Sequence, residues 1–364
     1  MPKLLGQLFD GPIDIIGDVH GEFDALRTLL KHLGYSQRGE HPQGRRLVFL
    51  GDLCDRGPDS PAVIRFVQQL VERDLAQCLL GNHEINVLRG SPKNGNGWFF
   101  AQDHDRLQGR FTHSAPADEQ QRQLIHGFFS TLPLTLQRDD LRLVHAAWLS
   151  NHIEAIASHE GQHDVLGLYH HYENQTEAQV VAIGLKRAVE AEHRRYGELL
   201  LDANASMPLL PALGLYDETY QMNNPVRVLT SGVERRTEMP FYTSGKWRMV
   251  ERVPWWDGYA ESVPVIVGHY WRWFNNATRQ LFGKGEADLF AERAPNDWAG
   301  SRGNVYCVDF SVGGRYKERE LGRQGPWGTR LAAIRWPERE VVFDEGERLR
   351  LNPAGPCDGW SGIG

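Results

Sequence analysis

The chain has 364 residues, of which 41% are hydrophobic and 24% charged, the ordinary composition of a globular protein that buries one large core or two smaller ones. A formal net charge of −7 excludes general electrostatic binding to nucleic acid or an anionic membrane, so phosphate recognition should be local. The N-terminal apolar run is too short for a signal peptide, and no stretch of about 18 apolar residues occurs. We therefore expect a cytoplasmic protein without membrane contact.

Three apolar strands in the first part of the chain each run into a glycine-containing polar segment. These are Ile13 to Ile16 before Gly17-Asp18-Val19-His20-Gly21, Leu47 to Leu50 before Gly51-Asp52-Leu53-Cys54-Asp55-Arg56-Gly57, and Gln77 to Leu80 before Gly81-Asn82-His83-Glu84. Helical spacing from Phe23 to Leu33 and from Ser60 to Val71, with Ser60 as an N-cap, fills the two intervals. The pattern predicts a β-α-β-α-β unit whose functional loops meet at the carboxyl ends of the strands.

One glycine-aspartate pair is most often a turn, because aspartate bonds its own backbone and glycine permits positive φ. Three such segments at the ends of successive strands are harder to explain as turns. They bring oxygen and nitrogen ligands to one place, as a site for two divalent metal ions requires.

The three segments resemble the signature of the phosphoprotein phosphatase family within the calcineurin-like metallophosphoesterases: Gly-Asp-x-His-Gly, Gly-Asp-x-x-Asp-Arg-Gly and Gly-Asn-His-Glu. All three are intact, and the resemblance covers about residues 13–145 and 263–343. It implies an α/β fold with a central two-sheet β-sandwich flanked by helices.

Two later strands also end at histidines. Leu141 to Val144 precedes His145, and Val263 to Val267 precedes Gly268-His269. In the family the matching histidines bind metal. His145 is followed by Ala146-Ala147, where the family usually has Gly or Ala and then Gly; a glycine there would let the backbone approach closely. His269 is followed by Tyr270-Trp271, where the family more often has Thr or Gln, so the substrate rim should differ.

The resemblance implies a ligand set for two divalent ions. Asp52 is the candidate bridge, Asp18 and His20 complete the first site, and the second site is completed by Asn82, His145 and His269. A mixed set of histidine and oxygen ligands suits manganese as the first expectation, with iron, zinc and nickel left open.

Three further residues have expected catalytic roles. His83 is the candidate general acid for the leaving oxygen, and Asp55 should orient it. Arg56 offers a planar fork for phosphate oxygens. The family also uses a later arginine, for which Arg248 and Arg252 both remain open; Arg227, Arg235 and Arg236 are less favoured.

The chain divides into a catalytic core of residues 1–150 and 259–348, a mainly helical insertion or cap of residues 151–258, and a C-terminal tail of residues 349–364. A helix is expected from Glu177 to Leu201, and residues 86–119 read as a long loop beside the site. The insertion histidines, expected to be solvated or capping rather than ligands, are His152, His159, His163, His170, His171 and His193.

Five tryptophans bracket the last ligand segment: Trp247, Trp255, Trp256, Trp271 and Trp273. We expect them in the core of the cap. The alternative is that some line the cleft and stack a nucleobase or a substrate side chain.

The leading hypothesis is a dinuclear metallophosphatase that hydrolyses phosphomonoesters, resembling bacterial serine/threonine protein phosphatases. One alternative keeps the metal site and acts on dinucleoside polyphosphates such as diadenosine tetraphosphate. Another is a non-catalytic metal-binding scaffold. The expected partner is a phosphorylated substrate, either a phosphoprotein or a nucleotide.

Overall fold

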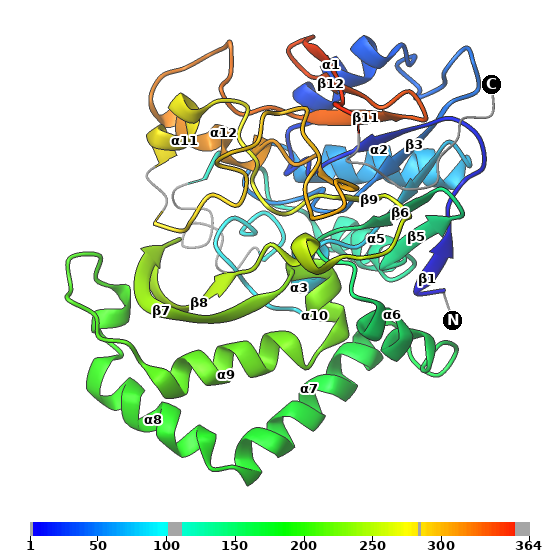
Figure 1. The fold of residues 1–364 in the computed structure, drawn as a ribbon. Coiled ribbons are helices and arrows are strands. Elements are labelled where there is room, and N and C mark those ends of the chain that lie inside the picture. The colour runs from blue at the N-terminus through cyan, green and yellow to red at the C-terminus, as the bar shows by residue number, and fades with distance from the viewer. Residues whose placement is uncertain (1–2, 101–110, 283–284, 354–364) are drawn as a thin grey trace.

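Two β-sheets pack face to face at the centre of the molecule (Figure 1). The computed structural model describes residues 3–100, 111–282 and 285–353. Alternate strand residues fill the layer between the sheets, among them Ile15 and Val48 from one sheet and Leu143 and Ile266 from the other, all fully buried. Successive strand side chains point to opposite faces, so their neighbours pack outward against helices. The predicted two-sheet sandwich flanked by helices is confirmed.

The first sheet contains the predicted β-α-β-α-β unit. Its strands, in spatial order, are β13 (Arg348–Arg350), β12 (Glu340–Phe343), β11 (Ala332–Trp336), β2 (Ile13–Ile16), β3 (Arg46–Phe49) and β4 (Ala76–Cys78). β2, β3 and β4 run parallel, whereas β11 is antiparallel to β2. The assignment of residues 349 and 350 to a tail is wrong, because both pair with β12 in β13.

Helices α1 (Phe23–Leu33) and α2 (Ser60–Glu72) connect these parallel strands. The N-cap of α2 is Asp59, whose side chain accepts the Ala62 N–H at 3.0 Å, and not Ser60 as predicted. The Ser60 hydroxyl instead accepts the Asp55 N–H at 2.9 Å. It therefore fixes the loop that carries Asp55 and Arg56.

The second sheet supplies three parallel strand ends to the same edge of the sandwich. Its spatial order is β1 (Leu5–Gln7), β5 (Thr135–Arg138), β6 (Leu141–Val144), β9 (Val265–Val267) and β10 (Val305–Cys307), with β6, β9 and β10 parallel. Helix α3 (Asn82–Leu88) comes after β4, and α5 (Glu119–Phe129) packs against α2 and α3. The loop predicted for residues 86–119 thus begins inside α3, and residues 101–110 lie outside the described part of the chain.

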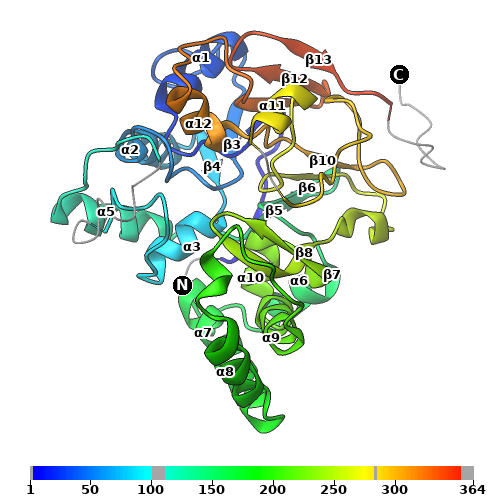
Figure 2. The ribbon, with the colours of Figure 1, turned by 90° about the vertical axis from the view of Figure 1, so that its left-hand side faces the viewer.

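The insertion is an arm of helices with a long hairpin above it, and α7 and α8 project away from the sandwich (Figures 1 and 2). Its elements are α6 (Ser150–Ala157), α7 (Val165–Ala182), α8 (Leu185–Tyr196), η2 (Leu199–Leu201), α9 (Pro211–Met222), α10 (Pro225–Ser231), β7 (Glu234–Thr243), β8 (Lys246–Arg252) and η3 (Trp255–Gly258). The helix predicted from Glu177 to Leu201 is wrong, because Gly184 at φ 71° separates α7 from α8. Sequence reasoning missed the hairpin, whose Ser244-Gly245 turn has φ values of 52° and 84°.

The insertion has a small core of its own, formed by residues such as Val180, Leu213 and Met249. Trp255 and Trp256 do not belong to it, contrary to expectation. They pack in the large core: the Trp255 indole donates to the Ala146 carbonyl at 3.1 Å, and Trp256 is part of the same apolar cluster.

The last part of the chain completes the site edge. It adds α11 (Asn276–Phe282), η4 (Val312–Gly314) and α12 (Arg315–Glu320). Glu318 fixes α12 against the segment that follows it by accepting the N–H groups of Gly328 and Thr329. Within the described ranges, no helix has the length and apolar character needed to cross a bilayer.

Candidate active site

Six strand ends converge on one buried point of the sandwich. Asp18 and His20 follow β2, Asp52 follows β3, Asn82 begins α3 after β4, and His145, His269 and Asp309 follow β6, β9 and β10. All six sequence-predicted ligand residues are thus brought together. Among the described residues, two groups have metal-ligand spacing, His20-Asp52-His83 and Asp52-His145-His269, and they share Asp52.

The carboxylate of Asp52 lies between these two groups. Its Oδ2 is 3.7 Å from His20 Nε2 and 3.8 Å from His83 Nε2. Its Oδ1 is 3.5 Å from His145 Nε2. The two oxygens therefore face opposite halves of the site, the arrangement that a bridging ligand needs.

A hydrogen bond from Nδ1 fixes the orientation of each ligand-candidate imidazole. The Nδ1–H groups of His20 and His145 donate to the carbonyls of Cys54 and Leu50, at 2.9 and 2.7 Å, so both Nε2 atoms face the centre. His269 Nδ1 donates to Asn82 Oδ1 at 3.0 Å, and its buried Nε2 has no hydrogen-bond partner among the described residues. A buried imidazole nitrogen without a partner, beside carboxylate and amide oxygens, fits a metal ligand set.

The backbone around the ligands is strained and tightly packed. His20, Asp52 and His269 have φ values of 47°, 47° and 68°, a region that costs energy for non-glycine residues and clusters at functional sites. A Cβ on Gly313 would lie 2.2 Å from the His20 ring, and one on Gly268 would lie 2.2 Å from Asp18 Oδ1. Both positions require glycine for the ligands to keep their place.

The site's electrostatics favour the ligand-competent forms of Asp52, His20 and His269, but not those of Asp18 and His145. Burial raises the pKa of Asp18. Burial alone would lower the pKa of His145, but Asp52 and Asp18 raise it to about 10. Burial alone would raise the pKa of Asp52, but His145, His83 and His20 together hold that pKa well below its usual value. Burial, with Arg56 beside His20 and Arg252 near His269, lowers the pKa of both imidazoles. Asp52 is therefore anionic, and His20 and His269 are neutral, as metal binding requires.

His83 lies beside the ligands in a hydrogen-bonded chain. Its Nδ1 is 2.5 Å from Asp55 Oδ2, and the other oxygen of Asp55 accepts the Trp98 indole N–H at 2.6 Å. The structure brings Asp55 and His83 together as the sequence predicted; Trp98 was missed, because no local pattern indicates such a long-range contact. The Nε2 of His83 faces the cavity side and could either donate a proton or bind metal.

Arg56 spans the front of the site. Its guanidinium donates to His20 Nε2 and to His83 Nε2, both at 3.0 Å, and its Cζ lies 5.0 Å from the Trp271 ring centroid. The guanidinium is thus within a few ångströms of the ligands, in reach of an anion bound there.

Two carboxylates support the site without lying in either ligand group. Glu84 accepts the N–H groups of Asp52, Leu53 and Gly81 at 2.8 to 2.9 Å and so holds the loops after β3 and β4 together. Asp309 accepts the Trp271 N–H at 2.8 Å and so holds the turn after His269. Asp309 was not assigned from sequence, although it follows an apolar strand as Asp18 and Asp52 do.

A cavity of about 530 Å³ opens above Asn82, His83 and Arg56. Arg248 and Arg252, the two open candidates for the later arginine, both line it from β8. Arg235 and Arg236 instead pair with Glu251 and Glu218, at 2.8 and 2.9 Å.

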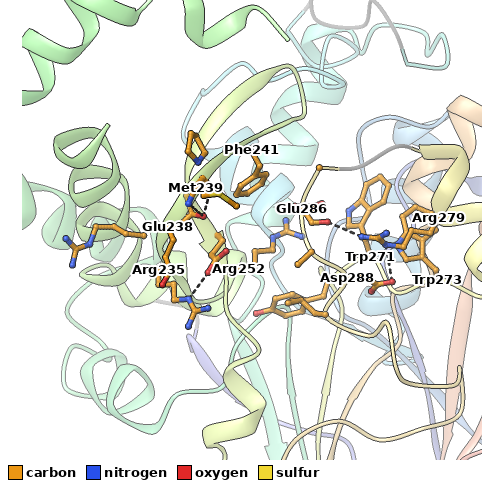
Figure 3. Close-up of a pocket in the computed structure, with 18 residues that line it drawn as sticks. Arg235, Glu238, Met239, Phe241, Arg252, Trp271, Trp273, Arg279, Glu286 and Asp288 are labelled. Atoms are coloured by element: carbon orange, nitrogen blue, oxygen red, sulfur yellow. Dashed lines mark hydrogen bonds and ion pairs between the residues drawn. The ribbon is translucent and has the colours of Figure 1, made fainter. Parts of the chain in front are cut away.

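A neighbouring outer cavity of about 660 Å³ (Figure 3) shares Phe241, Arg252, Trp271 and Glu286 with the active-site cavity. Its arginines Arg235 and Arg279 are paired with carboxylates. Trp271 is half-buried at the boundary of the two cavities, whereas Trp273 is buried.

The histidines of the insertion do not reach the site. The rings of His159, His163 and His171 cluster near the start of α7, with centroids 5.0 to 6.0 Å apart. His159 Nδ1 donates to the Ala155 carbonyl at 3.0 Å, a cap on the last turn of α6.

A two-sheet α/β sandwich whose parallel strands deliver carboxylates, an amide and histidines to one point defines a metallophosphoesterase. The family comparison gives the same result, because residues 11–214 match the family described as calcineurin-like phosphoesterase. The chain belongs to the calcineurin-like phosphoesterase family, and the predicted resemblance is confirmed.

Curated relatives are similar to the N-terminal part of the chain. The asymmetrical bis(5'-nucleosyl)-tetraphosphatase PrpE of Halalkalibacterium halodurans is 53% identical over 73 residues, 19% of this chain and 30% of that protein. PrpE of Geobacillus sp. (strain WCH70) is 35% identical over 142 residues, 36% of this chain and 55% of that protein. The chain therefore spans about half, or less, of the length of these relatives. The solved cold-active protein-tyrosine phosphatase of a psychrophilic Shewanella is 18% identical with a TM-score of 0.45, over 97% of this chain and 83% of that one.

Proposed function

We propose that the protein is a metal-dependent hydrolase of phosphate esters. The supporting observation is Asp52, whose two oxygens face two separate ligand groups. Asp18, His20 and Asp52 would hold one divalent ion, and Asp52, Asn82, His145 and His269 the other. Manganese is the first expectation, with iron, zinc and nickel open. When bound, two such ions neutralise phosphoryl oxygens and lower the pKa of a water between them.

Side chains of the protein protonate the leaving group and bind the phosphoryl oxygens. As the oxygen of water bonds to phosphorus and the ester P–O bond breaks, His83 Nε2 gives its proton to the leaving oxygen. Asp55 accepts the N–H on the other ring nitrogen, which fixes the ring and stabilises its charged form. Arg56 binds the phosphoryl oxygens by turning its fork from the two histidine nitrogens toward the cavity.

Among substrates, we favour a dinucleoside polyphosphate over a phosphoprotein. The cavity is lined by five cationic side chains, Arg56, Lys93, Arg248, Arg252 and Lys317, against the two carboxylates Glu234 and Glu286, an excess of positive charge that suits a substrate with several phosphates. Trp271 offers a half-buried ring on which a base could stack. Relatives named as tetraphosphatases share the N-terminal region. Serine/threonine protein phosphatase activity is the second candidate.

We also propose a domain organisation for the chain and a cytoplasmic location for the protein. Residues 1–150 and 259–348 form the catalytic core, and the insertion of residues 151–258 forms a cap, whose hairpin supplies one cavity wall. Cys54, Cys78 and Cys307 are buried free thiols, in keeping with the reducing environment of the cytoplasm.

The test is one activity panel on the full chain, loaded in turn with manganese, iron, zinc and nickel. The substrates are diadenosine tetraphosphate, a phosphoserine peptide and p-nitrophenyl phosphate. Asp52→Asn should lose metal and activity together, whereas His83→Ala should keep metal and lose activity. Wild-type protein that binds metal without cleaving any of the three substrates would overturn the proposal and favour a non-catalytic scaffold.

A further inference from the structure

A second cavity opens off the active-site cavity, on the side of the helical insertion. We call it the side cavity; its volume is about 530 Å³. It lies among α3, α7, α9, α10 and β8, and Asn82 of the candidate metal site is one of its walls. The residues that line both cavities are Asn82, Asn86, Lys93, Glu234, Arg248 and Val250. A ligand held at the metal site can therefore extend into the side cavity.

The side cavity is locally positive in a chain whose formal net charge is −7. Its lining has five cationic side chains against three carboxylates. The cations are Arg89, Lys93, Arg227, Lys246 and Arg248, and the carboxylates are Glu173, Asp217 and Glu234. Like charges gathered in one concave wall repel one another, so such a cluster is relieved by binding an anion.

Ion pairs inside the side cavity neutralise only part of its positive charge. Glu173 is shared between Arg89 at 3.2 Å and Arg227 at 2.9 Å, so one carboxylate serves two guanidinium groups. Within the described ranges, Arg248, Lys93 and Lys246 form no ion pair. Burial raises the pKa of Asp217 and Glu234 and lowers the pKa of Lys93 and Lys246.

Arg89 and Arg227, the two inner arginines of the side cavity, are held in place and keep N–H donors that no hydrogen bond uses among the described residues. Their Cζ atoms lie 4.1 Å and 5.2 Å from the ring centroid of Tyr169, which is itself buried. The Nε atoms of Arg89 and Arg227 are buried and have no hydrogen-bond partner among the described residues. A guanidinium has five N–H donors, and the bonds to Glu173 use one terminal nitrogen of each arginine, so further terminal N–H groups are left for an oxyanion in the cavity. Pre-oriented guanidinium forks suit phosphate oxygens better than a flexible lysine does.

We propose that the side cavity binds a phosphate group of the substrate other than the one that is cleaved. This inference rests on the proposed function and narrows it to substrates with several phosphates, such as a polyphosphate chain between nucleosides. Arg227 and Arg89 are its inner anchors, and Arg248 joins it to the active-site cavity. The insertion thereby takes part in substrate selection, because α10 and β8 supply three of the five cationic side chains, Arg227, Lys246 and Arg248.

The test compares Arg227→Gln with Arg235→Gln, a control at an exposed arginine that pairs with Glu251 outside the side cavity. Calorimetric titration of inorganic tripolyphosphate into the metal-free full chain needs no turnover. Arg227→Gln should weaken this binding at least tenfold, and Arg235→Gln should match the wild type. In metal-loaded protein, the ratio of the KM for diadenosine tetraphosphate to that for p-nitrophenyl phosphate should rise at least tenfold in Arg227→Gln only.

The outcomes separate this inference from the proposed function. Wild-type affinity for tripolyphosphate in Arg227→Gln overturns the side cavity as an anion site, whatever the protein hydrolyses. Weakened tripolyphosphate binding with an unaltered KM ratio overturns the substrate assignment and indicates a site for free phosphate anions. Should Arg227→Gln fail to fold, Lys246→Gln at the exposed rim gives the same comparison. Absence of any turnover overturns the proposed function, while the titration still reports on the cavity.

Discussion

The Nδ1 atom of His83 lies 2.5 Å from Oδ2 of Asp55, a fully buried carboxylate whose other oxygen is held by Trp98. These contacts give Asp55 the role of orienting the His83 imidazole and stabilising its charged form. Asp55→Asn should lower kcat about 10- to 100-fold, the usual cost of removing a carboxylate that orients a site histidine. Bound metal should stay at the wild-type level. Steady-state kinetics together with elemental analysis of the same sample checks both.

The matched control is Trp98→Phe, which removes one N–H donor and keeps the carboxylate. Its loss of kcat should be several-fold smaller than that of Asp55→Asn. Loss of metal from Asp55→Asn would contradict the assigned role and make His83 a ligand, as its place beside His20 and Asp52 also allows.

Replacing Arg56 should have opposite effects on metal affinity and on catalysis. Its guanidinium donates to His20 Nε2, the lone pair that a metal ion would use. Arg56→Gln should therefore bind metal at least as tightly as the wild type. Its kcat/KM should fall about 10- to 100-fold, because a charge-assisted hydrogen bond to phosphate contributes about 1.5–3 kcal/mol. A chelator-competition titration with manganese, run beside the kinetics, tests this; a parallel fall in metal affinity would contradict it.

Much of the site could be predicted because its signals are local. Asp18, Asp52 and Asn82 each follow a short apolar strand and a glycine, and parallel strands bring such ends together. What could not be predicted depends on distant contacts. The β7–β8 hairpin over the cavity has exposed, charged strands without clean alternation, and the Trp98–Asp55 bond joins residues 43 positions apart. Arg227 was placed among the less favoured arginines, since no sequence pattern shows that α10 lines the side cavity.

Replacing Gly313 tests how closely the backbone packs against the ligand candidate His20. A Cβ there would lie 2.2 Å from His20 Cδ2, closer than van der Waals contact allows, so the imidazole or η4 must move. Gly313→Ala should weaken metal binding about tenfold or more and destabilise the fold by about 1–3 kcal/mol from overpacking. Metal titration and denaturant unfolding measure the two effects. The control is Gly127→Ala in α5, where an added Cβ meets no atom within 4 Å; equal metal affinity in the two variants would contradict the prediction.

Glu318 links the stability of the site edge to pH. It is fully buried in α12 and accepts the N–H groups of Gly328 and Thr329 at 2.7 and 2.8 Å, the Thr329 hydroxyl at 2.6 Å and Arg323 at 2.9 Å. Burial alone would raise the pKa of Glu318, but these donors outweigh it and hold the pKa below its usual value. A carboxyl group whose pKa is lowered in the folded state stabilises the protein above its unfolded pKa of about 4.3. That contribution is lost as the pH falls through the folded pKa.

Glu318→Gln should therefore lower the free energy of unfolding by about 1–3 kcal/mol at pH 7, since one buried acceptor becomes an amide that meets donors. Glutamine does not titrate, so the difference from wild type should shrink once the pH falls below the unfolded pKa of about 4.3, because the unfolded wild-type chain then binds a proton more readily than the folded one. Urea unfolding at pH 7 and at pH 3.5 measures both differences. Glu320→Gln, at an exposed position of the same helix, should change stability by less than about 0.5 kcal/mol at either pH. A deficit in Glu318→Gln that is as large at pH 3.5 as at pH 7 would show that side-chain shape, and not the carboxylate charge, holds α12 against the Gly328 turn.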